Sequence, residues 1–512
     1  MPSGGIVILD YGSQYTQLIA RRIRAQNVFS QILPCTATRE QVTQYDPKGI
    51  VLSGGPSSVL DENAPRLPFD IWTLRLPVLG ICYGMQLIGL ELGLRVVRAG
   101  EAEYGFTRVE ADVDHALFRG TPRQQQVWMS HGDKVTGGEG RVAVLAVSEN
   151  SELAAFAAGD RGAIGVQFHP EVHHTAYGGQ ILHNFLFGVC GCEPNWAAGD
   201  IVDQMVVEIR EQVAGARVIC AVSGGVDSSV AACLIDRAIG NNLLCVFVDN
   251  GLLREGEAEN VVELLRGHLT ARLEVVDAKK RFLDRLRGVT DPEEKRLRIG
   301  NLFVQIFEEV GRKQGPFGYL AQGTLYPDRI ESTSTVGPSA TIKTHHNVGG
   351  LPEEMDFELV EPLRLLFKDE VREIGRALGL PEKQLGRHPF PGPGLAVRIL
   401  GEVTEEKLAL LRQADRIFIE GLHQWKLYDS VWQALAVLLP VRSVGVMGDA
   451  RTYGYPVVLR AVTSTDGMTA DWSDLPREFL KDISNRIINS VPGINRVVYD
   501  ISSKPPSTIE WE

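Results

Sequence analysis

The sequence predicts an α/β protein with two open, mostly parallel sheets in successive domains and a small α+β domain after them. Three observations carry this prediction. A chain of 512 residues is longer than one hydrophobic core organises. Short apolar runs of strand length alternate with helix-like stretches. Turns rich in glycine and serine follow several runs, where parallel sheets hold ligands. We expect domains at residues 5–195, 196–390 and 391–512.

Composition and charge exclude several classes of protein. Hydrophobic residues make up 44% of the chain and charged residues 23%, which is ordinary for a globular protein. The net charge is −12 and no block of Lys and Arg stands out, so we expect no nucleic-acid partner and no membrane partner. No apolar run approaches the ~20 residues of a membrane span, and the N-terminal segment does not resemble a secretion signal.

The cysteines indicate a reduced protein. Their number, seven, is odd, and they are scattered along a long chain, which does not suit a disulfide framework. The closest pair, Cys190-Gly-Cys192, lacks a second pair of zinc ligands. We therefore expect a cytoplasmic protein with free thiols.

In the first domain, three of the predicted strands end in residues suited to chemistry. One strand leads into Gly80-Ile81-Cys82-Tyr83-Gly84, a second into Phe168-His169-Pro170-Glu171, and a third into the glycine-rich segment Ser53–Ser58. Ligands bind beyond the carboxyl ends of such strands. The expected elements are strands at Ile6–Leu9, Gly49–Leu52, Pro77–Ile81, Val142–Val147 and Ala163–Phe168, and a helix at Ser13–Gln26.

The Gly-x-Cys-x-Gly segment is typical of a nucleophile elbow. The turn presents Cys82 at a helix N-terminus, where the dipole favours thiolate. Glu171 lies two residues beyond His169 on a predicted strand, so it shares a face with the imidazole and can orient it as the base for Cys82. Backbone N–H groups of Ser53–Ser58 and Tyr83 can form an oxyanion hole. Singly, a cysteine is more often a small buried hydrophobe, and His-x-Glu is more often a surface feature.

Together these segments resemble the class I glutamine amidotransferases over almost the whole first domain. The resemblance implies a triad of Cys82, His169 and Glu171, in which Cys82 attacks the glutamine amide, forms a glutamyl thioester and releases ammonia. It also places four residues at the oxyanion or the glutamine: Gly54, Gly55, Tyr83 and Gln86. We expect the nearby His131, His173, His174 and His183 to be structural or solvated.

The second domain is organised around a glycine turn. An apolar strand at Val218–Val222 runs into Ser223–Ser229, and a helix-like run follows from Val230. Free N–H groups and the helix dipole favour an anion there, and two glycines let a phosphate approach the backbone. The Walker A lysine is missing. The alternative is an ordinary strand-to-helix turn with small residues and no ligand.

The turn resembles the S-G-G-x-D-S loop of pyrophosphatase-type ATP enzymes, which are adenine-nucleotide hydrolase-like in fold. The resemblance implies that the loop holds the β,γ-phosphates of ATP and that Asp227 helps to hold Mg²⁺. Two further strands, Leu243–Val248 and Gly318–Ala321, end in Asp249 and in Gly323, where adenine can pack. Asp249 is equally consistent with a plain turn residue. The residues expected to bind ATP are Ser223, Gly224, Gly225, Val226, Asp227, Ser228, Ser229 and Gly323.

Residues 330–357 form a long polar segment with no helical or strand period. Such a loop is usually a lid or is disordered. Its adjacent Lys343, His345 and His346 suit the neutralisation of phosphate charge during nucleotidyl transfer, so we favour a catalytic lid.

The C-terminal part begins with the proline-glycine bend His388–Ile399, which cannot be helical. The chain ends in Lys504-Pro-Pro-Ser-Thr508-Ile509-Glu510-Trp-Glu, whose prolines, lysine and hydroxyls suit an ordered anion-binding tail. A disordered tail is the alternative. The expected elements are helices at Glu405–Glu420 and Arg477–Asn489 and strands at Ser443–Met447, Val457–Thr463 and Arg496–Ile501.

Along the full chain, these motifs resemble the GMP synthase family. The family implies glutamine, ATP and XMP as substrates, an adenylyl-XMP intermediate, and a homodimer formed through the C-terminal domain. Tyr326 and Met447 stand where some members have an arginine and a glutamine at XMP, which puts two substrate contacts in doubt. Motif matching assigns lid and activation residues Asp328, Glu331, Lys343, Thr344, His345 and His346, and XMP-binding residues Pro391, Gly392, Lys504, Thr508, Ile509 and Glu510.

Two alternative functions remain open from the sequence. The chain could be another amide-forming or tRNA-thiolating member of the same ATP group, although thiolation usually needs paired redox cysteines and a basic surface. It could also be a catalytically inactive nucleotide-sensing module. The intact Cys82, His169 and Glu171 beside an intact phosphate loop argue against the second.

Overall fold

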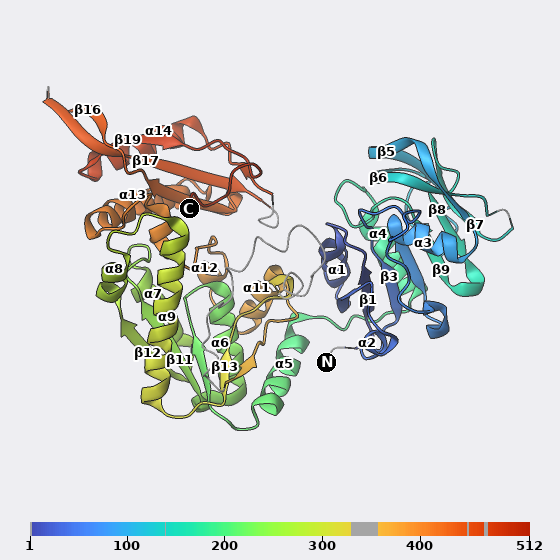
Figure 1. Ribbon diagram of the computed structural model, residues 1–512, viewed down its shortest axis with the longest axis horizontal. Helices are drawn as coiled ribbons and strands as arrows, with labels where there is room; N and C mark the ends of the chain where they lie inside the picture. The colour runs from blue at the N-terminus through green and yellow to red at the C-terminus, as the bar shows by residue number, and fades with distance from the viewer. Residues whose placement is uncertain (1–2, 139, 329–356, 448–449, 465–468) are drawn as a thin grey trace. The chain divides into compact units, whose positions relative to one another are not determined.

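The computed structural model describes residues 3–138, 140–328, 357–447, 450–464 and 469–512 (Figure 1). The chain divides into two compact units, Met1–Ile201 and Val202–Glu512. Three sheets and their helices confirm the predicted α/β class with an α+β C-terminal part. The expected domain boundaries at 195/196 and 390/391 stay predictions.

The first unit is built on a sheet whose described strands are parallel on one side and antiparallel on the other. The four-residue strands at its centre are fully buried, which explains their continuous apolar sequences. The parallel part is β2 (Ser30–Pro34), β1 (Ile6–Asp10), β3 (Gly49–Leu52), β4 (Val78–Ile81) and β9 (Ala163–Val166). The antiparallel part continues with β8 (Ala155–Ala158), β7 (Ala143–Ser148), β5 (Arg95–Ala111) and β6 (Gln124–Thr136). The helices include α1 (Thr16–Arg24), α2 (Arg39–Thr43), α3 (Tyr83–Glu91) and α4 (Gly178–His183).

The second unit begins with an all-parallel sheet in the order β12-β11-β10-β13-β14. The strand order reverses between β10 and β13, which is where open parallel sheets bind ligands. Residues of β10 and β11 pack against Val310 of α9 on one face of the sheet. The strands are β10 (Val218–Ala221), β11 (Leu243–Asp249), β12 (Arg272–Asp277), β13 (Tyr319–Ala321) and β14 (Glu358–Val360). The helices are α5 (Ala198–Val213), α6 (Val226–Ile239), α7 (Glu257–His268), α8 (Lys279–Leu286), α9 (Pro292–Gln314), α11 (Lys368–Ala377) and α12 (Glu382–Leu385).

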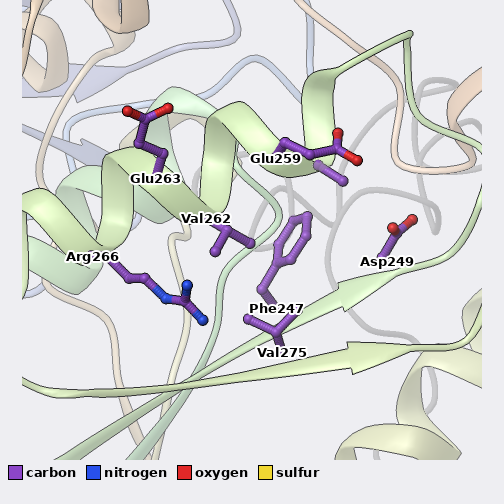
Figure 2. A pocket seen from close by; sticks show the side chains of 8 residues that line it. Phe247, Asp249, Glu259, Val262, Glu263, Arg266 and Val275 are labelled. Carbon is purple, nitrogen blue, oxygen red and sulfur yellow. The ribbon is translucent and has the colours of Figure 1, made fainter.

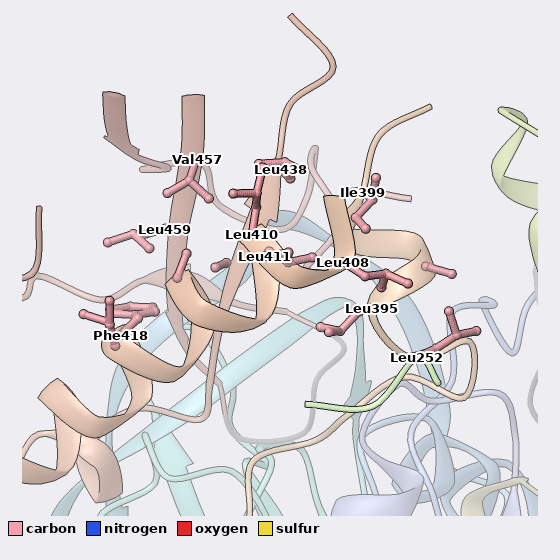
Figure 3. Packing of buried hydrophobic residues seen from close by; sticks show 14 of the residues in the cluster. Leu252, Leu395, Ile399, Leu408, Leu410, Leu411, Phe418, Leu438, Val457 and Leu459 are labelled. Atoms are coloured by element: carbon pink, nitrogen blue, oxygen red, sulfur yellow. The ribbon is translucent and has the colours of Figure 1, made fainter. Parts of the chain in front are cut away.

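The C-terminal part is a sheet arranged around the long strand β17 (Ala450–Thr463), which pairs with all four of its described neighbours. Its core joins α13 to β15 and β17 and also includes Leu252, so it spans both sides of the expected boundary at 390/391 (Figure 3). The other elements are α13 (Glu405–Gln424), β15 (Gln433–Leu438), β16 (Ser443–Met447), β18 (Asp471–Trp472), α14 (Arg477–Ser490) and β19 (Ile494–Tyr499).

Buried cations hold the C-terminal segment in place. Arg460 of β17 is fully buried and donates to the carbonyl oxygens of Ser502, Thr508 and Ile509 at 2.9–3.0 Å. It also forms an ion pair with Asp500 at 2.8 Å. Because a fully buried guanidinium requires acceptors for its N–H groups, these contacts constrain the course of the segment. The tail is therefore ordered, as the sequence indicated.

We predict that Arg460→Met destabilises the Val202–Glu512 unit by about 3–5 kcal/mol, because Asp500 and the three carbonyl groups lose their buried partner. Scanning calorimetry of the whole chain should show a lower unfolding temperature for this unit. The exposed Arg477 supplies a control, since Arg477→Met should change stability by no more than about 0.5 kcal/mol. Equal effects of the two substitutions would contradict the prediction.

Two candidate catalytic sites

Cys82 sits on a strained turn between β4 and α3. Its backbone has φ 51° and ψ −103°, which is unusual for a residue with a side chain and costs about 1–3 kcal/mol. A Cβ atom added to Gly84 would lie 2.4 Å from the carbonyl oxygen of Leu52, and one added to Gly80 would lie 2.5 Å from the backbone of Gly84. Both glycines are therefore required for the turn, as in a nucleophile elbow.

His169 and Glu171 form a buried pair in which the distance from Nδ1 to Oε1 is 2.7 Å. The prediction that they share the face of a strand is wrong, because β9 ends at Val166 and both residues lie in the loop that follows. Pro170 between them has no N–H to continue a ladder. Instead, the N–H of His169 donates to the carbonyl oxygen of Trp128 at 3.0 Å, which holds the imidazole in place.

The charge state of His169 depends on its partners. Burial by itself lowers the pKa of an imidazole, but the charge of Glu171 and the hydrogen bonds to Cys82 and Glu171 outweigh it. The pKa of His169 therefore lies well above its ordinary value. The imidazole therefore keeps its proton to a higher pH than a free histidine does.

The ends of β3, β4 and β9 meet at Cys82. A Cβ atom on Gly54 would lie 3.2 Å from Cε1 of His169, and one on Gly55 would lie 3.4 Å from Cγ of Tyr83. The N–H of Gly84 donates to the carbonyl oxygen of Ser53 at 3.1 Å, which joins the start of α3 to the glycine-rich loop. The structure thus brings together seven residues singled out in the sequence: Gly54, Gly55, Cys82, Tyr83, Gln86, His169 and Glu171.

A second histidine–carboxylate pair lies beside this site and was not recognised from the sequence as a pair. His131 contacts Glu103 at 3.0 Å through Nε2 and the carbonyl oxygen of Asp133 at 3.0 Å through Nδ1. Burial lowers the pKa of His131 although Glu103 opposes this shift. The carbonyl oxygen of Asp133 also accepts from the buried Gln86 at 2.9 Å. The alternating sequence of β6 could have indicated this face of the hairpin.

In the second unit, the glycine turn joins β10 to α6. Helix α6 begins at Val226, earlier than the expected Val230, so Asp227 and Ser228 lie in its first turn. Polar residues of this kind suit a helix start, where they can accept from free N–H groups. Gly224 has φ 80°, and a Cβ atom there would lie 2.4 Å from Val261. The hydroxyl of Ser228 accepts from the N–H of Ser223 at 3.2 Å and closes the loop.

One oxygen of the Asp227 carboxylate, the buried Oδ1, has no hydrogen-bond partner among the described residues. Burial raises the pKa of Asp227, and the positive charges of Lys368 and Arg372 on α11 oppose this shift. Sequence reasoning missed these two basic residues, although their i,i+4 spacing places them on one helix face. Gly323 lies beside the same turn, because its Cβ atom would be 3.5 Å from the backbone carbon of Asp227.

The candidate lid is mostly outside the described residues. Asp328 is described, and its carboxylate accepts from the N–H of Leu325 at 3.0 Å. Tyr326 is buried against Phe367. Glu331, Lys343, Thr344, His345 and His346 lie outside the described residues, as does the side chain of Met447.

The candidate XMP residues of the tail lie on the segment held by Arg460. Glu510 accepts from Arg398 at 3.0 and 2.8 Å and from Gln433 at 2.6 Å. Ile509 is buried in an apolar cluster, and Lys504 pairs through its backbone with Ala470. In the bend that precedes the C-terminal part, the carbonyl oxygen of Pro391 accepts from the N–H of Gly394 at 2.8 Å, and Gly392 is exposed. The carboxylate of Glu510 thus already has protein partners.

A pocket of about 470 Å³ lies between α7 and the strands β11 and β12 (Figure 2). Its lining includes the apolar Phe247, Val262 and Val275 and the charged Glu259, Glu263 and Arg266. Asp249 at one end forms an ion pair with Lys279 at 3.0 Å.

Family models match the segments of the chain that contain the two candidate sites. A family model described as "Glutamine amidotransferase class-I" matches residues 7–189. One described as "tRNA methyl transferase HUP domain" matches residues 216–272, and "GMP synthase C terminal domain" matches residues 420–511. The protein therefore belongs to the class that joins a glutamine amidotransferase to a nucleotide-binding HUP domain.

The family follows from full-length relatives. The chain is 59% identical over 510 residues to "GMP synthase (glutamine-hydrolyzing)" of Thermomicrobium roseum, covering 99% of this chain and 96% of that protein. Identity to the proteins of the same name is 55% for Thermosynechococcus vestitus, covering 99% of this chain and 96% of the relative, and 56% for Symbiobacterium thermophilum, covering 99% of each. The chain belongs to the glutamine-hydrolysing GMP synthase family.

We predict that Glu171→Gln lowers the pKa of His169 from its raised value, because the charge of the carboxylate no longer opposes burial and only Cys82 still does. Histidine-labelled NMR titration of the whole chain measures this pKa. Since the pair raises the pKa, its contribution to stability should be complete below the unfolded value of about 6.5 and be lost as pH rises through the folded pKa. Substitution of the exposed Glu149 by Gln is the control. An unchanged His169 pKa in the Glu171 variant would contradict the assignment.

Proposed function

We propose that this chain carries out the reaction XMP + ATP + glutamine + water → GMP + AMP + pyrophosphate + glutamate. The observation that carries the proposal is its identity to glutamine-hydrolysing GMP synthases over 99% of its length. The converged elbow site in one unit and the glycine turn in the other supply the two kinds of chemistry that the reaction needs. Hydrolysis of glutamine releases ammonia, and ATP makes the C2 carbon of xanthine electrophilic.

The glutamine half uses the elbow site. The thiolate of Cys82 attacks the amide carbon, and the N–H groups of Tyr83 and the Gly54–Gly55 turn stabilise the oxyanion. His169 donates its proton to the leaving ammonia, and the glutamyl thioester remains. Water, activated by His169, then releases glutamate and restores the thiol. Glu171 orients the imidazole, and Gln86 lies at the substrate.

The ATP half uses residues Ser223–Ser229. Their N–H and hydroxyl groups hold the β- and γ-phosphates while the O2 oxygen of XMP attacks the α-phosphorus and pyrophosphate leaves. Ammonia then displaces AMP from the adenylyl-XMP. The buried, unpartnered Oδ1 of Asp227 fits a Mg²⁺ ligand, and the ion would neutralise phosphate charge there. We assign adenine packing to Gly323, phosphate contacts to Lys368 and Arg372, and activation to Asp328, Glu331, Lys343, Thr344, His345 and His346.

XMP binding is assigned to the bend and the tail. The ordered course of the tail supports this assignment, because a fixed backbone can present Lys504 and Thr508 to a nucleotide without an ordering cost. Glu510 is positioned by its ion pair with Arg398. The residues assigned to XMP are Pro391, Gly392, Lys504, Thr508, Ile509 and Glu510.

We also propose a homodimer and a cytoplasmic location. The exposed Val444, Val446 and Tyr453 on the hairpin of β16 and β17 supply apolar surface for pairing with a second chain. All seven cysteines are free thiols, which suits a reducing compartment. No helix within the described ranges is long and apolar enough to cross a membrane.

We predict that Cys82→Ala abolishes GMP formation from glutamine but retains most of the GMP formation from ammonium salts, because only the first path needs the thiolate. Absorbance assays with each nitrogen donor measure both rates. Loss of both activities in a folded variant would remove Cys82 from this role. The same wild-type assay tests the function itself, since failure to form GMP from XMP and AMP from ATP with either donor would refute it.

We predict that Asp227→Asn raises the Mg²⁺ concentration needed for half-maximal activity at least tenfold, because the amide is a weaker ligand for a hard cation. Pyrophosphate release with ammonium as nitrogen donor, measured across a Mg²⁺ series, keeps the glutamine site out of the assay. The exposed Asp200 supplies the control variant Asp200→Asn. An unchanged Mg²⁺ dependence would show that Asp227 is not a metal ligand.

A further inference from the structure

The carbonyl group of Gly224 in the glycine turn is held from outside the loop by two side chains far along the sequence. Nε2 of Gln384 donates to this oxygen at 2.8 Å, and Nη1 of Arg387 donates to it at 3.1 Å. Gln384 also reaches the hydroxyl of Ser229 at 3.4 Å. The Gln384 side chain is buried, so its amide reaches this turn without competition from water.

The orientation of this carbonyl group determines the direction of an N–H group. The carbonyl of Gly224 and the N–H of Gly225 belong to one planar trans peptide, so they point in opposite directions. With the oxygen held outward, the N–H of Gly225 points back into the loop, toward Oγ of Ser223 at 3.4 Å. A rotated peptide would turn the oxygen toward a bound phosphate and repel it. Such rotation is easy next to glycine, which has no side chain to resist it.

The two side chains are themselves firmly anchored. Arg387 forms a short ion pair with Glu257 at the start of α7, and Glu257 in turn accepts from the N–H of Arg254 at 3.0 Å. Leu385, the residue that follows Gln384, is fully buried. A Cβ atom on Gly375 of α11 would lie 2.5 Å from Leu385, so α12 packs closely against α11. The donors are therefore preorganised toward Gly224.

We propose that Gln384 and Arg387 are positioning residues for phosphate binding, which hold the Gly224 peptide so that the N–H of Gly225 faces the β,γ-phosphates. The inference rests on the proposed function of the loop. It differs from a purely structural role, because it requires the two residues to affect the phosphate end of the nucleotide and to leave the XMP site unchanged.

The test uses Gln384→Met and Arg387→Lys in the full-length chain. Methionine keeps the length of the side chain without its donor, and lysine keeps the charge opposite Glu257 without the planar fork. Isothermal titration with Mg²⁺ and inorganic pyrophosphate reports on the loop, and the KM for XMP in the ammonium-dependent reaction reports on the remaining site. Lys383→Met, an exposed substitution on the same helix, is the matched control.

We expect each variant to bind pyrophosphate roughly three- to tenfold more weakly, as for the loss of one hydrogen bond, with the KM for XMP within twofold of wild type. Unchanged pyrophosphate affinity in both variants would overturn the proposal. Equal losses for pyrophosphate and XMP would also overturn it, because they would indicate general structural damage. If wild-type protein itself does not bind pyrophosphate, the proposed function of the loop is wrong instead.

Discussion

Steric crowding at the carboxyl ends of parallel strands is the constraint on which both sites depend. There the chain must turn within a few residues and still leave N–H groups facing a ligand. At the elbow, the backbone of Gly84 passes so close to Leu52 that no side chain fits. At the glycine turn, Gly224 faces Val261 at similar range and adopts a left-handed conformation. The packing of the sheet and its helices therefore selects glycine before any chemistry does, and the chemistry uses the N–H groups that result.

The two sites use this constraint differently. At the elbow, the strain falls on Cys82 itself, whose φ of 51° lifts the thiol out of the helix start and toward His169. At the glycine turn, Gly224 has the unusual backbone conformation, and the polar residues Asp227 and Ser228 lie in the regular helix α6. A nucleophile must be presented as a side chain, whereas a phosphate is bound mostly by the backbone. The difference in where the strain lies follows from what each ligand needs.

Buried charge has a parallel role in the C-terminal part. Arg398 and Arg460 are both fully buried, and each is matched by a carboxylate: Glu510 for Arg398 and Asp500 for Arg460. Because an unmatched charge would be costly there, these pairs permit few alternative paths for the chain. The final segment thus gains a defined course that its own composition would not provide. The hydrophobic core of the C-terminal part also includes Leu252, which follows β11. The sheet that contains β11 and the C-terminal sheet therefore share one core (Figure 3).

Much of the fold was accessible from the sequence because the decisive signals are local. Central strands such as Gly49–Leu52 are short apolar runs, and burial on both faces of the sheet requires that pattern. The strand that ends at Val166 was predicted to end two residues later, and the helix that begins at Val226 was predicted to begin four residues later. At the first point Pro170 cannot continue a strand ladder. At the second, α6 begins directly after the glycine turn, with Gly225 as its N-cap, and so includes polar residues that precede the apolar run on which the prediction relied. The hairpin of β5 and β6 was missed, although its alternation was present in β6.

The sequence by itself determined the class of the fold, the elbow cysteine and the glycine turn, because each rests on residues adjacent in the chain. Only the tertiary structure decided which distant groups serve them. Gln384 and Arg387 reach Gly224 across some 160 residues, and Lys368 and Arg372 approach Asp227 from another helix. No local pattern marks such residues, since a buried amide or a basic helix face is common in proteins without this role. Their partners are selected by strand order and helix packing, which involve the whole unit at once.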